Sequence, residues 1–188
     1  MTQSRSFDDA SSRPVADGLA QAARSAPLWL ALGSGALLLG ALAFQYLGGL
    51  APCVLCLWQR WPHAAVVVIG LVGFFAVGHD RGRAAVSALL ALVLIAGAGI
   101  AAFHVGVEQG WWEGTAACGG AAAAGGLSAS DLRQQLLSVP VVRCDEVAWA
   151  FLGISMAGWN GLASLALAGA GTIAAIRLSR TPRPGDLR

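Results

Sequence analysis

The stretch AAVSALLALVLIAGAGIAAFHVGV, residues 84–107, contains no Asp, Glu, Lys or Arg. A helix needs roughly 20 consecutive apolar residues to cross about 30 Å of bilayer hydrocarbon, and this stretch is long enough. Similar apolar stretches occur at residues 28–47, 62–78 and 159–176, and the second is expected to extend back as a helix to Cys53. The sequence therefore predicts an all-α integral membrane protein, a four-transmembrane-helix bundle with helices at about 28–47, 53–78, 84–107 and 158–177.

The composition of the whole chain agrees with a membrane location. Hydrophobic residues make up 56% of the sequence and charged residues only 12%, so most of the chain would be insoluble unless it faced lipid. All twelve basic residues are Arg, and a net charge of +2 spread along the chain is too small for a nucleic-acid-binding surface. These values exclude a soluble globular domain and a nucleic-acid partner.

The remaining segments are polar and define the organisation of the chain. Residues 1–27 lack the apolar region and cleavage site of a secretory signal, so we expect a disordered cytoplasmic tail there. Residues 79–83 form a very short turn, and residues 178–188 form a second cytoplasmic tail. Only residues 108–157, between the third and fourth helices, are long enough for a functional loop. The membrane domain therefore covers residues 28–177.

The distribution of arginine indicates the orientation, because basic loops are retained in the cytoplasm. One side of the predicted bundle carries nine of the twelve arginines: Arg5, Arg13, Arg24, Arg81, Arg83, Arg177, Arg180, Arg183 and Arg188. The other side carries Arg60, Arg133 and Arg143. We therefore expect both termini in the cytoplasm, and all four cysteines on the periplasmic side, where disulfides form and persist.

Cys53-Val54-Leu55-Cys56 lies where the second helix begins, at the membrane surface. At 100° per residue, Cys53, Cys56, Arg60 and His63 share one helical face, and Pro52 suits the first helical turn. The positive end of the helix macrodipole, with Arg60 one turn after Cys56, favours thiolate over thiol. The pair is therefore a candidate redox site facing a membrane-soluble partner. Two buried structural cysteines beside an interfacial arginine are the alternative.

The other two cysteines, Cys118 and Cys144, lie in the long loop, so two dithiol pairs could pass electrons in relay. Cys118 precedes a run of Gly and Ala at residues 119–126, whose backbone should be mobile and let this cysteine meet a partner. Residues 128–137 have the pattern of a short helix resting on the membrane. A static Cys118–Cys144 disulfide without a redox role stays open as an alternative.

His104 lies in the last turns of the third apolar stretch, with Glu108 four residues later on the same helix face. Ionisable groups near membrane depth are costly and usually face the bundle interior or water. His104 is therefore a candidate site residue, although a plain interfacial histidine explains it equally well.

A longer string, Pro52-Cys53-Val54-Leu55-Cys56-Leu57-Trp58-Gln59-Arg60, resembles the DsbB family of bacterial disulfide bond formation proteins. The four apolar helices, the second cysteine pair and the string Arg143-Cys144-Asp145-Glu146-Val147-Ala148-Trp149 share this resemblance, which covers roughly residues 28–176. Gln59 departs from the family, in which this position is often acidic. In bacteria, DsbA, DsbB and quinone together keep the periplasm oxidising.

The resemblance implies a thiol:quinone oxidoreductase of the bacterial inner membrane that reoxidises a periplasmic DsbA-like dithiol oxidase. It implies two redox-active disulfides, Cys53–Cys56 and Cys118–Cys144, with Cys118 attacked by the partner, Cys144 attacking Cys53, and Cys56 passing electrons to the quinone. Arg60 matches the family arginine that holds the quinone, and His104 corresponds less closely to a family histidine near it. The acceptor is ubiquinone or menaquinone from the membrane pool, and no metal is expected.

Two other classes of protein stay open. A four-cysteine metal-binding membrane protein is possible, but two ligands at a helix start and two far apart in a flexible loop are poor zinc geometry. A non-catalytic membrane scaffold with static disulfides is the second alternative.

Overall fold

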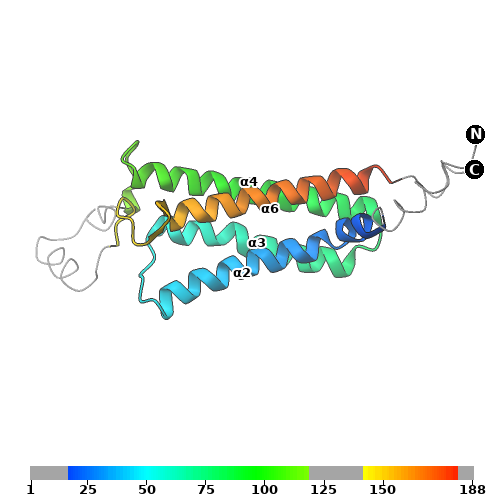
Figure 1. The fold of residues 1–188 in the computed structure, drawn as a ribbon, viewed down its shortest axis with the longest axis horizontal. Coiled ribbons are helices and arrows are strands. Elements are labelled where there is room, and N and C mark those ends of the chain that lie inside the picture. The colour runs from blue at the N-terminus through cyan, green and yellow to red at the C-terminus, as the bar shows by residue number, and fades with distance from the viewer. Residues whose placement is uncertain (1–16, 119–141, 182–188) are drawn as a thin grey trace, which may run out of the picture.

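Four long helices run alongside one another in this computed structural model, which describes residues 17–118 and 142–181 (Figure 1). They are α2 (Ala26–Tyr46), α3 (Val54–Ala76), α4 (Asp80–Glu108) and α6 (Met156–Ser179). All four are long and apolar enough to cross a membrane. The prediction of an all-α, four-span membrane protein is therefore confirmed.

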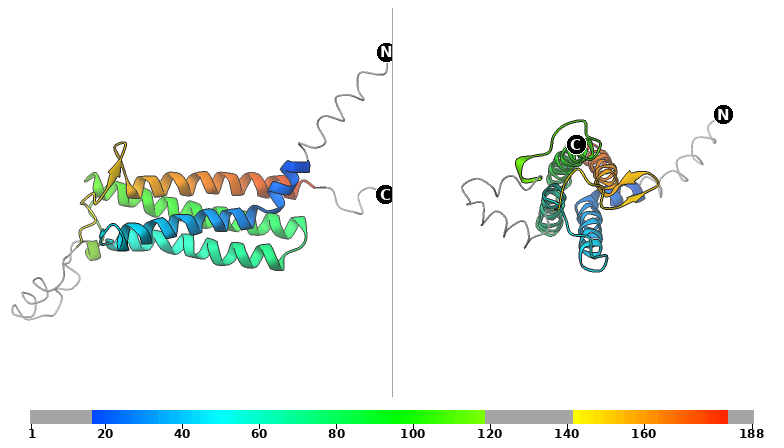
Figure 2. Two further views of the ribbon diagram at one scale, coloured as in Figure 1. Left: turned by 60° about the horizontal axis from the view of Figure 1, so that its bottom comes forward. Right: turned by 90° about the vertical axis from the view of Figure 1, so that its left-hand side faces the viewer.

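Short elements gather at one end of the bundle, which we call the cysteine end because Cys53, Cys118 and Cys144 lie there (Figure 2). They are the 3-10 helix η1 (Ala116–Cys118) and the strands β1 (Ala150–Phe151) and β2 (Ile154–Ser155). β1 and β2 pair antiparallel, with Ala150 opposite Ser155 and Phe151 opposite Ile154. Leu152 and Gly153 turn the chain between them with φ of 52° and 77°. The resulting hairpin carries the chain back to the start of α6.

Small residues let α4 and α6 pack closely, and this pair makes the most extensive helix contact in the described part of the chain. A Cβ added at Gly161 would lie 3.2 Å from the Cβ of Ala101. At Gly70, on the α3 side, it would lie 2.6 Å from the carbonyl oxygen of Pro27, so only glycine fits there. Close backbone approach through small residues is how helices associate in lipid, where no hydrophobic force drives them together.

The bundle interior is apolar at its centre, and large apolar side chains also cover its outside. Leu30, Val66, Leu90, Leu94 and Ala168 form one buried cluster between the four helices. Leu32, Val68, Phe75 and Leu92 instead point outward and are more than 60% exposed. An apolar exterior of this kind requires a lipid solvent.

The N-terminal tail is shorter than expected. Residues 17–24 are helical, and Ala23 and Ala26 pack against Ala84, Ala174 and Leu178. The guanidinium of Arg24 donates two hydrogen bonds to the carboxylate of Asp80, at 3.0 and 3.1 Å. The expectation of a disordered tail is therefore wrong for residues 17–27, because this segment docks on the start of α4. Residues 1–16 lie outside the described residues.

Side chains at the helix starts explain the other differences in helix limits. Asp80 to Arg83 belong to the first turn of α4, not to a turn between helices, and Asp80 supplies the acidic group that favours a helix N-terminus. α6 begins at Met156 because the Ser155 hydroxyl accepts the Gly158 N–H at 3.2 Å, and it runs on to Ser179, into the expected C-terminal tail. The expected mobile run at 119–126 and short helix at 128–137 both fall outside the described residues.

Candidate functional site

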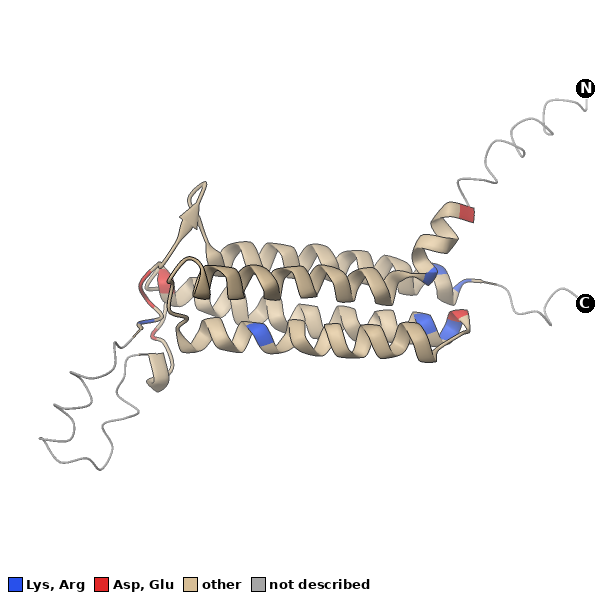
Figure 3. Ribbon diagram, turned by 90° about the horizontal axis from the view of Figure 1, so that it is seen from below, with Lys and Arg blue, Asp and Glu red and all other residues tan. Residues whose placement is uncertain are grey.

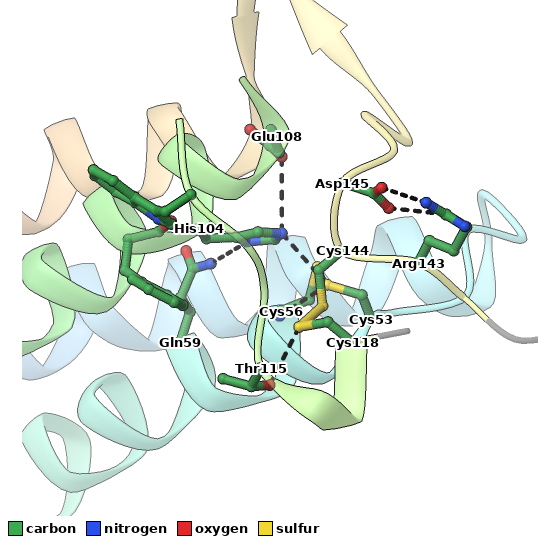
Figure 4. Close-up of a disulfide and its surroundings, with 12 residues drawn as sticks. Cys53, Cys56, Gln59, His104, Glu108, Thr115, Cys118, Arg143, Cys144 and Asp145 are labelled. Atoms are coloured by element: carbon green, nitrogen blue, oxygen red, sulfur yellow. Dashed lines mark hydrogen bonds and ion pairs between the residues drawn. A yellow bond between two sulfur atoms is a disulfide. The ribbon is translucent and has the colours of Figure 1, made fainter. Parts of the chain in front are cut away.

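Three buried cysteines meet at the cysteine end. Cys53, Cys118 and Cys144 pack with Leu55 and Val107, and their exposed fractions are 4%, 5% and 0%. A disulfide joins Cys118 to Cys144. Figure 4 shows the sulfur of Cys53 beside this disulfide, although Cys53 comes from the start of α3 and the other two come from the segments around the long loop. The fold therefore brings the two cysteine pairs together.

Cys53 caps α3 instead of belonging to it. Its extended backbone, with φ of −72° and ψ of 171°, places the sulfur over the helix end, where it accepts the Cys56 N–H at 3.2 Å. Pro52 consequently precedes the cap, and the expectation that it lies in the first helical turn is wrong. The shared helical face predicted for Cys53, Cys56 and Arg60 is also wrong for Cys53, because a cap residue does not follow the helical rotation.

Cys53 and Cys56 are both free in this structure, so the expected Cys53–Cys56 disulfide is not formed. Their sulfurs lie 2.8 Å apart and are joined by a hydrogen bond. That hydrogen bond lowers the pKa of the Cys53 thiol; burial opposes it, while His104 and the Cys56 backbone N–H add to the lowering. The arrangement is that of a reduced pair in which Cys53 is the better thiolate.

Cys118 is buried and contacts its neighbours, and the residues expected to make it mobile lie outside the described part of the chain. Its N–H donates to the Thr115 carbonyl oxygen at 2.8 Å, and its sulfur lies 3.4 Å from the Thr115 hydroxyl. A groove of about 570 Å³ runs beside it, lined among others by Trp111, Trp112 and Arg143. The groove makes this side of the disulfide the side nearest to solvent.

His104 and Glu108 extend the cysteine cluster on the α4 side. The Nε2 of His104 lies 3.5 Å from the Cys53 sulfur and 3.9 Å from Glu108 Oε1, and both side chains are almost fully buried. The Ser155 hydroxyl donates to the other Glu108 oxygen at 2.5 Å. Figure 4 shows His104 between Glu108 and the two cysteine pairs. The imidazole therefore connects a buried carboxylate to a redox sulfur.

Buried amides continue the hydrogen bonds from His104 into the bundle. The Gln59 amide donates to His104 Nδ1 at 2.7 Å, so the proton of a neutral His104 lies on Nε2, toward Cys53. The Asn160 amide donates to Gln59 Oε1 at 2.6 Å, and Asn160 Oδ1 accepts from His63 Nε2 at 2.8 Å. Side chains of α4, α3 and α6 thus form one polar chain, His104–Gln59–Asn160–His63.

An apolar cavity of about 500 Å³ lies next to this polar chain, between α2, α3, α6 and the β1–β2 hairpin. Cys56, Gln59, Arg60, His63 and Asn160 line it, and its walls include Phe44, Trp149, Phe151 and Trp159. The Arg60 guanidinium donates to Gln45 Oε1 at 2.7 Å. Cys53 and His104 are not among its lining residues in the described ranges. Of the two reduced cysteines, only Cys56 therefore reaches the cavity.

Sequence reasoning found part of this site. It singled out the four cysteines, Arg60 and His104, placed His63 on the face of the cysteine pair without giving it a role, and did not consider Asn160. Polar side chains within apolar helices are costly and face the bundle interior, so Gln59 and Asn160 carried a usable signal. Their mutual contact could not be predicted, because 101 positions separate them in the sequence.

The geometry does not favour a four-cysteine metal site. Cys118 and Cys144 are bonded to each other, which removes two of the four ligands. In the described ranges, the one remaining group of candidate ligands is Cys53, Cys56 and His104, whose ligand atoms lie within 4.8 Å of one another.

Comparisons with known proteins identify the family of this chain. The family model for the disulfide bond formation protein DsbB matches residues 23–174. The chain is 31% identical over 150 residues to disulfide bond formation protein B of Aromatoleum aromaticum, covering 70% of this chain and 81% of that protein. It is 32% identical over 151 residues to the Polaromonas protein of the same name, covering 77% and 86%. The corresponding Methylococcus capsulatus protein is 35% identical over 131 residues, covering 66% and 76%. No solved structure matches.

Proposed function

Because this chain belongs to the DsbB family of disulfide bond formation proteins, we propose that it is a membrane thiol:quinone oxidoreductase. It reoxidises a periplasmic DsbA-like dithiol oxidase and passes two electrons to a quinone of the membrane pool. One observation carries the proposal: Cys53 packs against the Cys118–Cys144 disulfide, while its neighbour Cys56 lines an apolar cavity. Cys53 can thus exchange electrons with the disulfide that a soluble partner attacks, and Cys56 can exchange them with a lipid-soluble acceptor.

The proposed orientation places the cysteine end in the periplasm and both termini in the cytoplasm of a bacterial inner membrane. Apart from one basic residue within a helix, charged residues gather at the two ends of the bundle, and basic residues dominate the end that lies opposite the cysteine end (Figure 3). The excess of arginine at that end supports a cytoplasmic location for it.

Thiol–disulfide exchange can carry oxidising equivalents outward through the cluster. The partner's thiolate attacks Cys118, which forms a mixed disulfide and releases Cys144 as a thiolate. Cys144 attacks Cys53 of a Cys53–Cys56 disulfide, which forms a Cys53–Cys144 bond and releases Cys56. The partner's second thiolate then resolves the mixed disulfide and leaves the partner oxidised. Cys118 next attacks Cys144, which restores their disulfide and leaves Cys53 and Cys56 reduced, the state seen here.

The partner meets this route at the groove beside Cys118. Cys118 is only 5% exposed, so attack requires a small displacement of its segment. The groove is rimmed by Trp111 and Trp112, which are 68% and 45% exposed. Exposed aromatic side chains of this kind are frequent anchors in protein interfaces.

Reoxidation of Cys53 and Cys56 needs an acceptor. A DsbA-type partner is a strong oxidant at about −120 mV, and stable structural disulfides lie below about −300 mV, a gap of roughly 8 kcal/mol against transfer. A quinone would accept the two electrons and two protons, and the steady removal of these electrons into the membrane pool would supply the driving force. The cavity fits such a ring: it is apolar, aromatic and open to Cys56, and Arg60 can stabilise negative charge as electrons leave the sulfur. His104 reaches the cavity only through Gln59.

A stoichiometric assay tests the proposal. The purified protein in lipid vesicles is mixed with a reduced DsbA-like partner and either ubiquinone or menaquinone. We expect one quinone reduced for each partner disulfide formed, and the preferred quinone is the one that supports faster turnover. Partner oxidation that proceeds without quinone consumption would contradict the proposal.

A further inference from the structure

His63 lines the cavity, and one of its ring nitrogens has no hydrogen-bond partner among the described residues. Its side chain is 3% exposed, and its Nε2 is hydrogen-bonded to Asn160 Oδ1. The nitrogen without a partner among the described residues is Nδ1. A buried polar atom without a partner costs free energy, so a native structure that retains one calls for an explanation. His63 lines the cavity, so a ligand there could supply the missing partner.

The position of His63 on α3 suits a ring that also meets Cys56. Cys56, Arg60 and His63 are separated by four and three residues and all line the cavity. Seven residues of helix rise about 10 Å, and helical side chains lean toward the N-terminus, so His63 leans back toward Cys56. A quinone carries two oxygens on opposite sides of its ring. A ring along this face can therefore contact Cys56 and Arg60 with one side and His63 with the other.

We propose that His63 Nδ1 hydrogen-bonds one ring oxygen of the quinone, and that Asn160 and Gln59 hold His63 in place for this contact and link it to His104. The inference rests on the proposed function, since it names the side chains that receive the acceptor of that reaction. It assigns His63 a binding role and Asn160 a positioning role.

The polar chain suits both redox forms of the ring. With the amides as they stand, His63 carries its proton on Nε2, so Nδ1 accepts, which matches the hydroxyl of a quinol. If the Gln59 and Asn160 amides each turn by 180°, every hydrogen bond reverses and Nδ1 becomes a donor, which matches the carbonyl of a quinone. In that direction His104 Nε2 becomes an acceptor toward Cys53. The same four residues thus serve the acceptor before and after reduction.

Two substitutions of His63 test the contributions of its two ring nitrogens separately. In His63→Asn, the amide places a polar group where Nδ1 stands and loses the contact with Asn160. In His63→Gln, the amide reaches the position of Nε2 and leaves the cavity side without a polar atom. A matched control is Ser87→Ala, which removes another buried hydroxyl without a hydrogen-bond partner in the described part of the chain, on α4 and away from the cavity.

The measurement is equilibrium binding of a short-chain ubiquinone and of its quinol, followed by quenching of tryptophan fluorescence, since Trp149 and Trp159 line the cavity. We expect His63→Gln to bind both forms about 5- to 10-fold more weakly. His63→Asn should stay within about threefold of the unmodified protein, and Ser87→Ala should match it. Each variant must keep the melting temperature of the unmodified protein to within a few degrees.

The outcomes separate the two proposals. If the unmodified protein binds neither the quinone nor the quinol, the proposed function fails. If it binds them and His63→Gln binds them equally well, the role of His63 is overturned while the proposed function stands. If both His63 variants have a lowered melting temperature, Asn160→Leu is tested instead. Weaker binding of the quinone and quinol by this variant supports the role given to the hydrogen-bonded chain, and unchanged binding overturns it.

Discussion

The Cys53 sulfur lies 3.5 Å from Nε2 of His104, which joins the start of α3 to the end of α4. The Gln59 amide on Nδ1 keeps the proton of a neutral His104 on Nε2, facing the sulfur. An imidazole N–H that faces sulfur stabilises the thiolate. We therefore expect His104 to affect the chemistry of Cys53 directly, and to affect the cavity only through Gln59.

The first prediction is that Cys53 titrates at low pH. In Cys56→Ser, with Cys118–Cys144 intact, Cys53 is the only thiol, and the serine hydroxyl still donates to it. The pKa of Cys53 is lowered, so the thiolate should persist well below the ordinary thiol range near pH 8.5. Adding His104→Phe should move the transition to higher pH, as measured by thiolate absorbance near 240 nm. A transition that does not move would remove His104 as a cause.

The second prediction concerns Cys56, the cysteine that faces the cavity. Cys56→Ser should abolish quinone-dependent turnover, because no disulfide can form with Cys53 and no sulfur reaches the acceptor. The mixed disulfide between the partner and Cys118 should still form and is detectable on a non-reducing gel. Normal turnover in this variant would refute the role given to Cys56.

The third prediction assigns Arg60 to the acceptor. Arg60→Ala should raise the quinone KM by about tenfold or more, since a charge-assisted hydrogen bond contributes ~1.5–3 kcal/mol. Mixed-disulfide formation at Cys118 should be unaffected. Arg180→Ala is the matched control, because this exposed arginine lies at the opposite end of the bundle and does not line the cavity. Equal quinone dependence in the two variants would rule out Arg60 as a quinone contact.

The fourth prediction concerns the groove beside Cys118. Trp111 is 68% exposed, so Trp111→Ala should leave the fold intact. The KM for the reduced partner should rise several-fold, while the KM for quinone stays the same. Arg60→Ala should instead raise the KM for quinone and leave the KM for the partner unchanged, so the two variants distinguish the partner site from the quinone site. An unchanged partner KM would place the docking surface elsewhere.

The four spans were predictable because the bilayer imposes a length and an apolar composition on each helix. The limits of those helices were not predictable, because they depend on single side chains at the helix starts: the Ser155 hydroxyl caps α6, and the acidic Asp80 favours the first turn of α4. The redox chemistry of Cys53 and Cys56 was suggested by their spacing. The sequence did not predict that Cys53 faces the disulfide while Cys56 faces the cavity, because this difference follows from the extended backbone at Cys53.

The polar chain shows a further limit of sequence reasoning. His104, Gln59, Asn160 and His63 belong to three helices, and no local pattern links them. Each residue alone reads as an isolated polar side chain in an apolar helix. Only lateral packing, set by small residues such as Gly161 at the α4–α6 contact, decides which of them meet.

The last prediction tests the orientation on which the whole route depends. In a background in which all four cysteines are replaced, Glu113→Cys marks the cysteine end and Ser179→Cys marks the opposite end, and both positions are exposed. A membrane-impermeant maleimide added to intact spheroplasts should label Glu113→Cys at once, and Ser179→Cys only after the membrane is permeabilised. The reverse pattern would place the cysteines in the reducing cytoplasm. There the partner would be out of reach and the glutathione and thioredoxin systems would keep the thiols reduced, so the electron route could not operate.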